Sequence, residues 1–293
     1  STLTVTQEAT LDGGGVVTLS GQGQRRLINI SNPQNQTFTF TVQNISFNNG
    51  STPGGSGAAI FRTNNGPWQA ISLKVINSHF DNNHAIQVEQ DGGGGAIYAT
   101  GMDEVLISDL TFTNNSGSNG GAVYTLGTDV LKITDSWFDG NAATGNSGNP
   151  GNGGNAGAIG VDGAERMVNI CRTQITNNTA NAYGVGFFSV MYDQQSLTAF
   201  TDVLFAENIN PQDFGLGGGA YIQGGPLLIV LCFGQLINVG SGSVGCLLTM
   251  TGNEKAMRDI ILISAFMNIL LSLVLVQALG VLGVAYATSI SVI

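Results

Sequence analysis

Residues 71–98, ISLKVINSHFDNNHAIQVEQDGGGGAIY, contain the two signatures that decide the fold. In the first signature, the apolar residues Leu73 and Val75 stand seven and five places before Phe80, and this period of two predicts a strand. In the second signature, glycines before AIY predict a tight corner that leads into a short apolar strand. The stretch therefore predicts two strands joined through a turn.

Both signatures recur through the first 225 residues. The position of Phe80, called the anchor position, has equivalents in six segments that are spaced by 33, 32, 26, 37 and 30 residues. It is occupied by Phe47, Phe80, Phe112, Phe138, Ile175 and Phe205. Five residues earlier stand Val42, Val75, Ile107, Ile133, Ile170 and Phe200. Three residues later stand Asn83, Asn115, Asn141, Asn178 and Asn208, whereas the first segment has Asn49 one place early.

This period of about 30 residues indicates a parallel β-helix. Equivalent residues of successive coils would stack about 4.8 Å apart, so that apolar ladders form the core and the asparagines bond to one another and to the turns. A β-propeller fits less well, because each blade needs four strands in about 40–45 residues. We therefore expect a mainly β solenoid of about seven coils over residues 1–225, with a long surface loop at 144–157.

The composition changes near residue 225. The net charge of −10 falls within residues 1–225, whereas residues 226–293 carry two basic and two acidic residues and are otherwise apolar. The run 260–276 would form a helix of roughly 25 Å, just short of a bilayer core of about 30 Å. We predict two domains, 1–225 and 226–293, the second an apolar α-helical segment. It would contact a membrane, cover the end of the β-helix or form the core of a soluble domain.

The acidic balance disfavours nucleic-acid binding, which needs basic stripes that displace counterions. Three cysteines, Cys171, Cys232 and Cys246, form no CxxC pair and are too few for a disulfide framework. The sequence holds no P-loop, HExxH or GxSxG motif and no zinc-binding spacing.

The pairing of GGAI(Y) with FxxN over about residues 40–222 resembles the repeat of the polymorphic outer membrane proteins. It is also similar to the broader right-handed β-helix, pectate-lyase-like superfamily, and LDGGGVVTLSG at 11–21 is similar to the first coil of secreted bacterial β-helix proteins. The resemblance implies a right-handed solenoid on a bacterial cell surface or in the secreted fraction. Residues 234–291 instead resemble the C-terminal helices of polysaccharide flippases. The resemblance rests on the segments MTGNEK, FMNILLSLVLV and LGVLGVAYATSIS.

Candidate catalytic residues stand three places before the anchor position. Asp109, Asp135 and Asp202 would line one exposed edge, with Arg172 between the last two. As in pectate lyases, stacked carboxylates from Asp109, Asp135 and Asp139 would hold Ca²⁺, and the basic side chain would take a substrate proton. The other interpretation is structural, because Asn and Asp tolerate left-handed bends and an arginine between two aspartates relieves their repulsion.

Two outward residues directly before the anchor position, Trp137 and His79, are candidates for carbohydrate binding, because an exposed indole can stack on a sugar ring. We expect a non-catalytic cell-surface or secreted protein that is adhesin-like or structural and displays loops. The alternative is a Ca²⁺-dependent polyuronate lyase or a glycoside hydrolase. Expected partners are a polysaccharide, a host or neighbouring cell surface, and a second copy stacked end to end.

Overall fold

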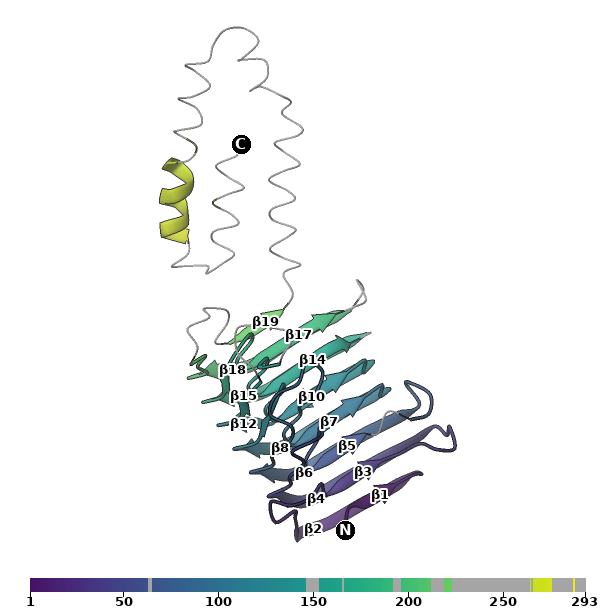
Figure 1. Cartoon of the computed structure of the whole chain (residues 1–293). Helices are drawn as coiled ribbons and strands as arrows, with labels where there is room; N and C mark the ends of the chain where they lie inside the picture. Colours follow the sequence, from purple (N-terminus) through teal and green to yellow (C-terminus); the bar gives the residue numbers. More distant parts are fainter. Residues whose placement is uncertain are drawn as a thin grey trace. The chain divides into compact units, whose positions relative to one another are not determined.

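The computed structural model describes residues 1–62, 65–145, 153–164, 166–191, 196–211, 219–222, 264, 266–275 and 287. The chain divides into two units, Ser1–Gln223 and Gly224–Ile293 (Figure 1). Each unit is described by itself, and the first holds all the strands given below.

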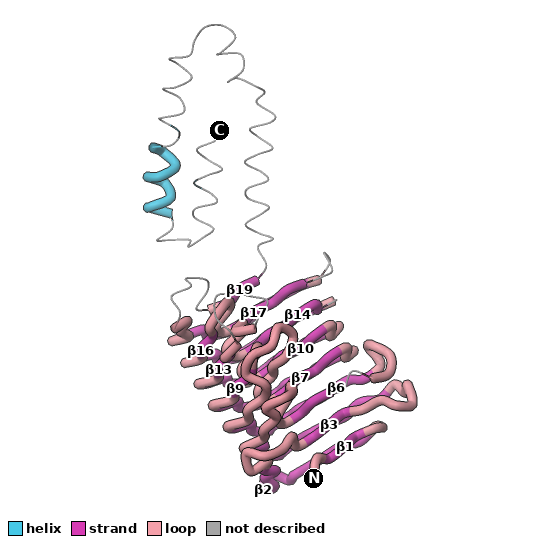
Figure 2. The backbone as a smooth tube through the Cα atoms, in the orientation of Figure 1, coloured by secondary structure: helices cyan, strands magenta, loops and turns pink. Residues whose placement is uncertain are grey.

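The strands of the first unit form three parallel sheets (Figure 2). Sheet A consists of β1 (Leu3–Val5), β3 (Ile28–Ile30), β5 (Ile60–Arg62), β7 (Ile97–Thr100), β10 (Val123–Leu126), β14 (Ile159–Ala164), β17 (Phe187–Met191) and β19 (Ala220–Ile222). Sheet B consists of β2 (Ala9–Ser20), β4 (Phe38–Asn48), β6 (Ile71–Asp81), β8 (Glu104–Thr113), β11 (Val130–Thr134), β12 (Trp137–Asp139), β15 (Met167–Thr176) and β18 (Leu197–Ala206). Sheet C consists of β9 (Ser116–Gly117), β13 (Ala142–Ala143) and β16 (Thr179–Ala180).

Each repeat contributes strands to sheets A and B in turn, so strands one repeat apart in sequence lie side by side. The prediction of a mainly β chain built from parallel strands is confirmed. The strand expected before each anchor position lies in sheet B, and the glycine signature leads into sheet A. Sequence periodicity did not predict sheet C, because its strands are only two residues long.

The anchor position forms a buried aromatic column. Register pairs Phe47 with Phe80, Phe80 with Phe112 and Phe112 with Phe138. Their ring centroids are 4.5 to 4.9 Å apart and their planes nearly parallel. This spacing is that of hydrogen-bonded strands, so the backbone ladder places each ring on the next. These completely buried side chains form the core together with the apolar residues of both sheets.

The predicted asparagine ladder is also present, and it is buried. The Nδ2 of Asn115 donates to Asn141 Oδ1 at 2.9 Å, and Asn141 Nδ2 donates to Asn178 Oδ1 at 3.0 Å. Each of these amides also donates to the carbonyl of the anchor residue one repeat earlier. Asn49 does not join this ladder. It lies in an outer column, where its Oδ1 accepts a hydrogen bond from Asn82.

In six repeats, a left-handed residue bends the backbone of sheet B three places before the anchor position. The bend residues are Asn44, Asn77, Asp109, Asp135, Arg172 and Asp202, with φ between 42° and 59°. Asn and Asp tolerate this conformation because their short polar side chains bond locally. The bend turns the strand between two inward-facing positions, which agrees with the structural interpretation of these residues.

In the second unit, residues 266–275 form a helix. The predicted domain boundary near residue 225 and most of the segment that resembles the flippases lie outside the described residues, as does much of the loop 144–157. Within the part of the chain that is described, no helix is both long and apolar enough to cross a membrane.

Candidate functional site

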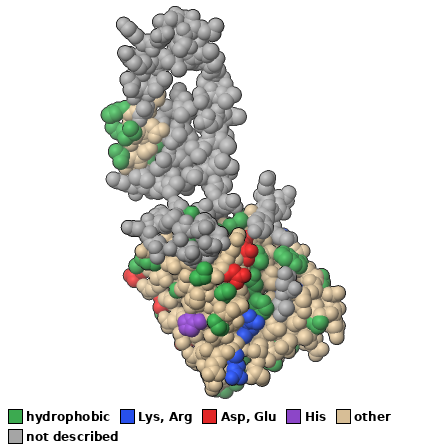
Figure 3. Space-filling model, in the orientation of Figure 1, with side chains coloured by type: hydrophobic (Ala, Val, Ile, Leu, Met, Phe, Trp, Pro, Cys, Tyr) green, Lys and Arg blue, Asp and Glu red, His purple; other side chains and the backbone are tan. Residues whose placement is uncertain are grey.

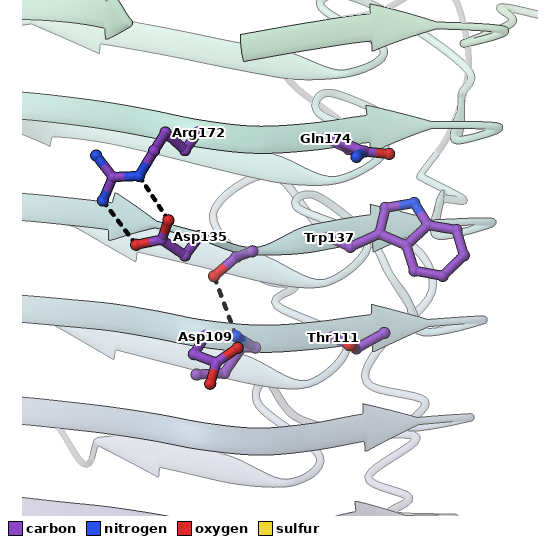
Figure 4. Close-up of a pocket in the computed structure, with 8 residues that line it drawn as sticks. Asp109, Thr111, Asp135, Trp137, Arg172 and Gln174 are labelled. Carbon is purple, nitrogen blue, oxygen red and sulfur yellow. Dashed lines mark hydrogen bonds and ion pairs between the residues drawn. The ribbon is translucent and has the colours of Figure 1, made fainter. Parts of the chain in front are cut away.

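Two shallow hollows adjoin on the outer face of sheet B, and together they are called the groove. The first, of about 460 Å³, is lined by Asp109, Leu110, Thr111, Asp135, Ser136, Trp137, Arg172 and Gln174 (Figure 4). The second, of about 290 Å³, is lined by Gly15, Asn44, Ile45, Ser46, Asn77, Ser78, His79, Asp109 and Thr111. Because both include Asp109 and Thr111, the groove runs across neighbouring strands.

Two columns of side chains form the walls of the groove. The left-handed bend residues form one wall, and the outward residues directly before the anchor position form the other. The floor is formed by the residues between them, such as Ser136, whose Oγ accepts the backbone N–H of Leu110 at 3.2 Å. The bend thus creates the hollow, since it separates the two walls by one inward-facing residue.

Arg172 binds Asp135 through a two-pronged ion pair. Its Nε donates to Asp135 Oδ1 at 2.6 Å and its Nη2 donates to Oδ2 at 2.7 Å, and Nη2 also donates to Thr134 Oγ1 at 2.8 Å. The hydrogen bonds from Arg172, helped by one from Thr134, lower the pKa of Asp135 to about 2. The hydrogen bonds to Asp135 and its charge raise the pKa of Arg172, with smaller contributions from Cys171 and Asp202. At neutral pH both partners are charged.

The other predicted acidic residues stand on neighbouring strands, outside this ion pair. Asp109 is exposed one repeat before Asp135, and Asp202 is exposed one repeat after Arg172. Asp139 directly follows the anchor residue Phe138, and its Oδ1 accepts hydrogen bonds from Thr176 Oγ1 and Asn177 Nδ2, each at 2.7 Å. Asp109, Asp135, Arg172 and Asp202 thus share one column, and Asp139 does not belong to it.

Among the described residues, no group of three or more His, Cys, Asp or Glu side chains is arranged to hold a metal ion. Both carboxylate oxygens of Asp135 and the Oδ1 of Asp139 already accept hydrogen bonds, whereas Asp109 presents its carboxylate to the groove (Figure 4). Binding of Ca²⁺ by Asp109, Asp135 and Asp139 stays a prediction.

Trp137 and His79 stand in the same outward column, separated by Thr111. The Trp137 side chain is 44% exposed, and its Nε1 donates to Thr176 Oγ1 at 2.9 Å. That bond fixes the indole beside the groove while leaving ring surface accessible to solvent. His79 lines the second hollow and is half-buried.

Sequence reasoning missed Thr111, Gln174 and Ser136 as lining residues. The signal that could have found them is the repeat register, because Thr111 and Gln174 flank Trp137 on the neighbouring strands. On the face in Figure 3, charged side chains are scattered among hydrophobic and uncharged polar ones.

Comparisons with known proteins identify the repeat. Residues 77–100 and 109–126 match the Chlamydia polymorphic membrane protein repeat, so the resemblance expected from the GGAI(Y) and FxxN signatures is confirmed. The chain is also similar to the probable autotransporter YfaL of Escherichia coli strain K12, with 36% identity over 80 residues. That match covers 27% of this chain and 6% of the relative. No solved structure matches the chain.

Proposed function

We propose that residues 1–225 are a repeat module of a bacterial cell-surface or secreted protein, folded as a right-handed parallel β-helix of about seven coils. The module would be non-catalytic and adhesin-like, and would bind a polysaccharide of a host or neighbouring cell surface along the groove. The polymorphic membrane protein repeats and the likeness to an autotransporter support the location. The parallel registers, with the chain moving between sheets A and B in each repeat, support the solenoid.

The observation that carries carbohydrate binding is the half-exposed Trp137 in a column of smaller side chains. Thr111 and Gln174 flank it on neighbouring strands, and both belong to the lining of the same hollow. Sugar recognition commonly combines an aromatic platform for the ring face with polar groups for the hydroxyls. The groove offers both, on strands whose register is set by a buried core.

The alternative of a Ca²⁺-dependent lyase or a glycoside hydrolase rests on Asp109 and Asp135 in one column. The ion pair counts against this enzymatic alternative. A general base must be deprotonated before it can accept a proton, whereas the raised pKa of Arg172 keeps its guanidinium protonated. A lyase would form new C=C bonds, so ultraviolet absorbance of polyuronates incubated with the chain and Ca²⁺ tests it directly. An increase that is abolished in Arg172→Gln would overturn the non-catalytic proposal.

Carbohydrate binding is tested with the full chain on an array of bacterial and host glycans. We expect a bound glycan, and a loss of about fivefold or more in affinity for Trp137→Ala. Trp68→Ala is the matched control, because Trp68 is similarly exposed at 49% but lies outside the lining of the groove. Binding that survives Trp137→Ala, or no binding to any glycan, would refute the proposal. Protease treatment of intact cells that produce the chain tests surface display separately.

A further inference from the structure

The groove has an excess of negative charge. Asp109, Asp135 and Arg172 line it directly. Asp12 borders the second hollow, where its Oδ1 accepts a hydrogen bond of 2.9 Å from the lining residue Asn44. Asp202 lies close enough to Arg172 to raise the pKa of the guanidinium. These residues supply four carboxylates and one guanidinium.

The guanidinium of Arg172 is already paired, so an acidic ligand would have to compete with Asp135 for it. Both carboxylate oxygens of Asp135 accept hydrogen bonds from Arg172, so the two charges compensate each other. The lysines of sheet B, Lys74 and Lys132, are not among the residues that line the two hollows. Lys132 instead forms an ion pair of 2.7 Å with Glu104. A chain of uronic acids would therefore meet these carboxylates, and among the described residues that line the two hollows there is no lysine beside them.

Asp109 is the charge best placed to select a ligand. Its side chain is exposed, it lines both hollows, and its carboxylate has no hydrogen bond or ion pair to another described residue. Trp137 stands at the opposite side of the first hollow, where it pairs in register with Thr111, and its indole points away from Asp109 (Figure 4). A carboxylate and an exposed indole on adjacent strands can bind an ammonium group and a sugar ring together.

We infer that the groove binds a chain of amino sugars with free amino groups, in preference to neutral or uronic-acid chains. This inference rests on the proposed function, because it assumes that Trp137 provides the sugar platform. The ammonium group of one deacetylated amino sugar would bind the Asp109 carboxylate while another sugar ring of the same chain stacks on the indole. An N-acetylated chain would keep the stacking and lose the charge interaction.

The experiment measures binding of the full chain to three oligosaccharides of equal length: glucosamine, N-acetylglucosamine and galacturonic acid oligomers. We expect the glucosamine oligomer to bind most tightly. Added salt that shortens the Debye length from about 30 Å to about 8 Å should weaken this binding, because it screens the attraction between the charges. Asp109→Asn should weaken that binding about two- to fivefold and leave binding of the acetylated oligomer unchanged. Trp137→Ala should weaken both.

Glu8→Gln is the matched control, because Glu8 is exposed outside the groove and its change alters the overall charge equally. An equal effect of Glu8→Gln and Asp109→Asn would overturn the inference, since it would show attraction to the acidic protein as a whole. Equal or tighter binding of the acetylated or acidic oligomer would overturn it while the proposed function stands. Failure of all three oligomers here, together with an empty glycan array, would instead refute the proposed function.

Discussion

Substituting Asn141 by alanine tests whether the buried asparagine ladder holds the repeats together. Asn141 is completely buried. Its Oδ1 accepts the backbone N–H of Asn115 at 3.1 Å and the Nδ2 of Asn115 at 2.9 Å. Its Nδ2 donates to Asn178 Oδ1 at 3.0 Å and to the carbonyl of Phe112 at 3.0 Å. Alanine removes all of these bonds and provides no replacement.

The expected loss of stability is about 4 kcal/mol, from four hydrogen bonds at about 1 kcal/mol each. Not every partner is left unsatisfied, because Asn115 Nδ2 keeps its bond to the Phe80 carbonyl and Asn178 Oδ1 keeps the backbone N–H of residue 141. The backbone N–H of Asn115 has no such substitute. The loss should therefore be concentrated between the two repeats that this N–H connects.

Urea unfolding gives the total loss, and hydrogen exchange at the Asn115 amide gives its location, which matters because repeat arrays can unfold in parts. The control is Asn114→Gly, a neighbouring exposed residue with φ of 55° whose side chain donates to Asp81. Glycine adopts this φ freely, so we expect a loss below about 1 kcal/mol. A loss in Asn141→Ala no greater than in this control would refute the reasoning.

The close packing of the turns leads to one further prediction, and the ion pair leads to two. Gly121→Ala should strongly lower the midpoint of urea unfolding, because an added Cβ would collide with the backbone of Gly157 and Ala142. Gly54→Ala is the control, because the space around Gly54 is open, and it should leave the midpoint nearly unchanged. The ionised Asp135 carboxylate should contribute to the free energy of unfolding above pH 3.8, its usual pKa. This contribution should be lost as the pH falls through the folded-state pKa of about 2. In Arg172→Gln the Asp135 pKa, followed by NMR, should rise toward its usual value, and a pKa that stays near 2 would contradict the assigned cause.

The sequence predicts the ladders well because burial imposes them. Phe80 and Phe112 recur at the anchor position because an inward side chain must pack on its equivalent in the next repeat. The outer column of Asn49, Asn82 and Asn114 was not predicted, since exposed left-handed turns accept several polar residues and leave no apolar period.

Contacts made by loops could not be predicted in the same way. The Trp68 ring lies against Gly101 and Gly127, from the next two repeats, at positions where a Cβ would collide with it. No periodic signal connects a residue outside the repeat signatures to those glycines. The Asp135–Arg172 pair was predictable only as adjacency in a column, because its two-pronged geometry depends on side-chain torsions that the register does not determine.

The left-handed bend decides which groove residues need a functional explanation. Asp109 and Asp202 sit at a position where φ is positive in six repeats, and aspartate is favoured there without any ligand. Arg172 is less suited to its φ of 44°, but the ion pair with Asp135 gives it a structural reason. Trp137 has a weaker structural reason, because its hydrogen bond to Thr176 does not require a large ring that stays 44% exposed. Function in this groove should therefore be sought first at Trp137, with Asp109 modifying the choice of ligand.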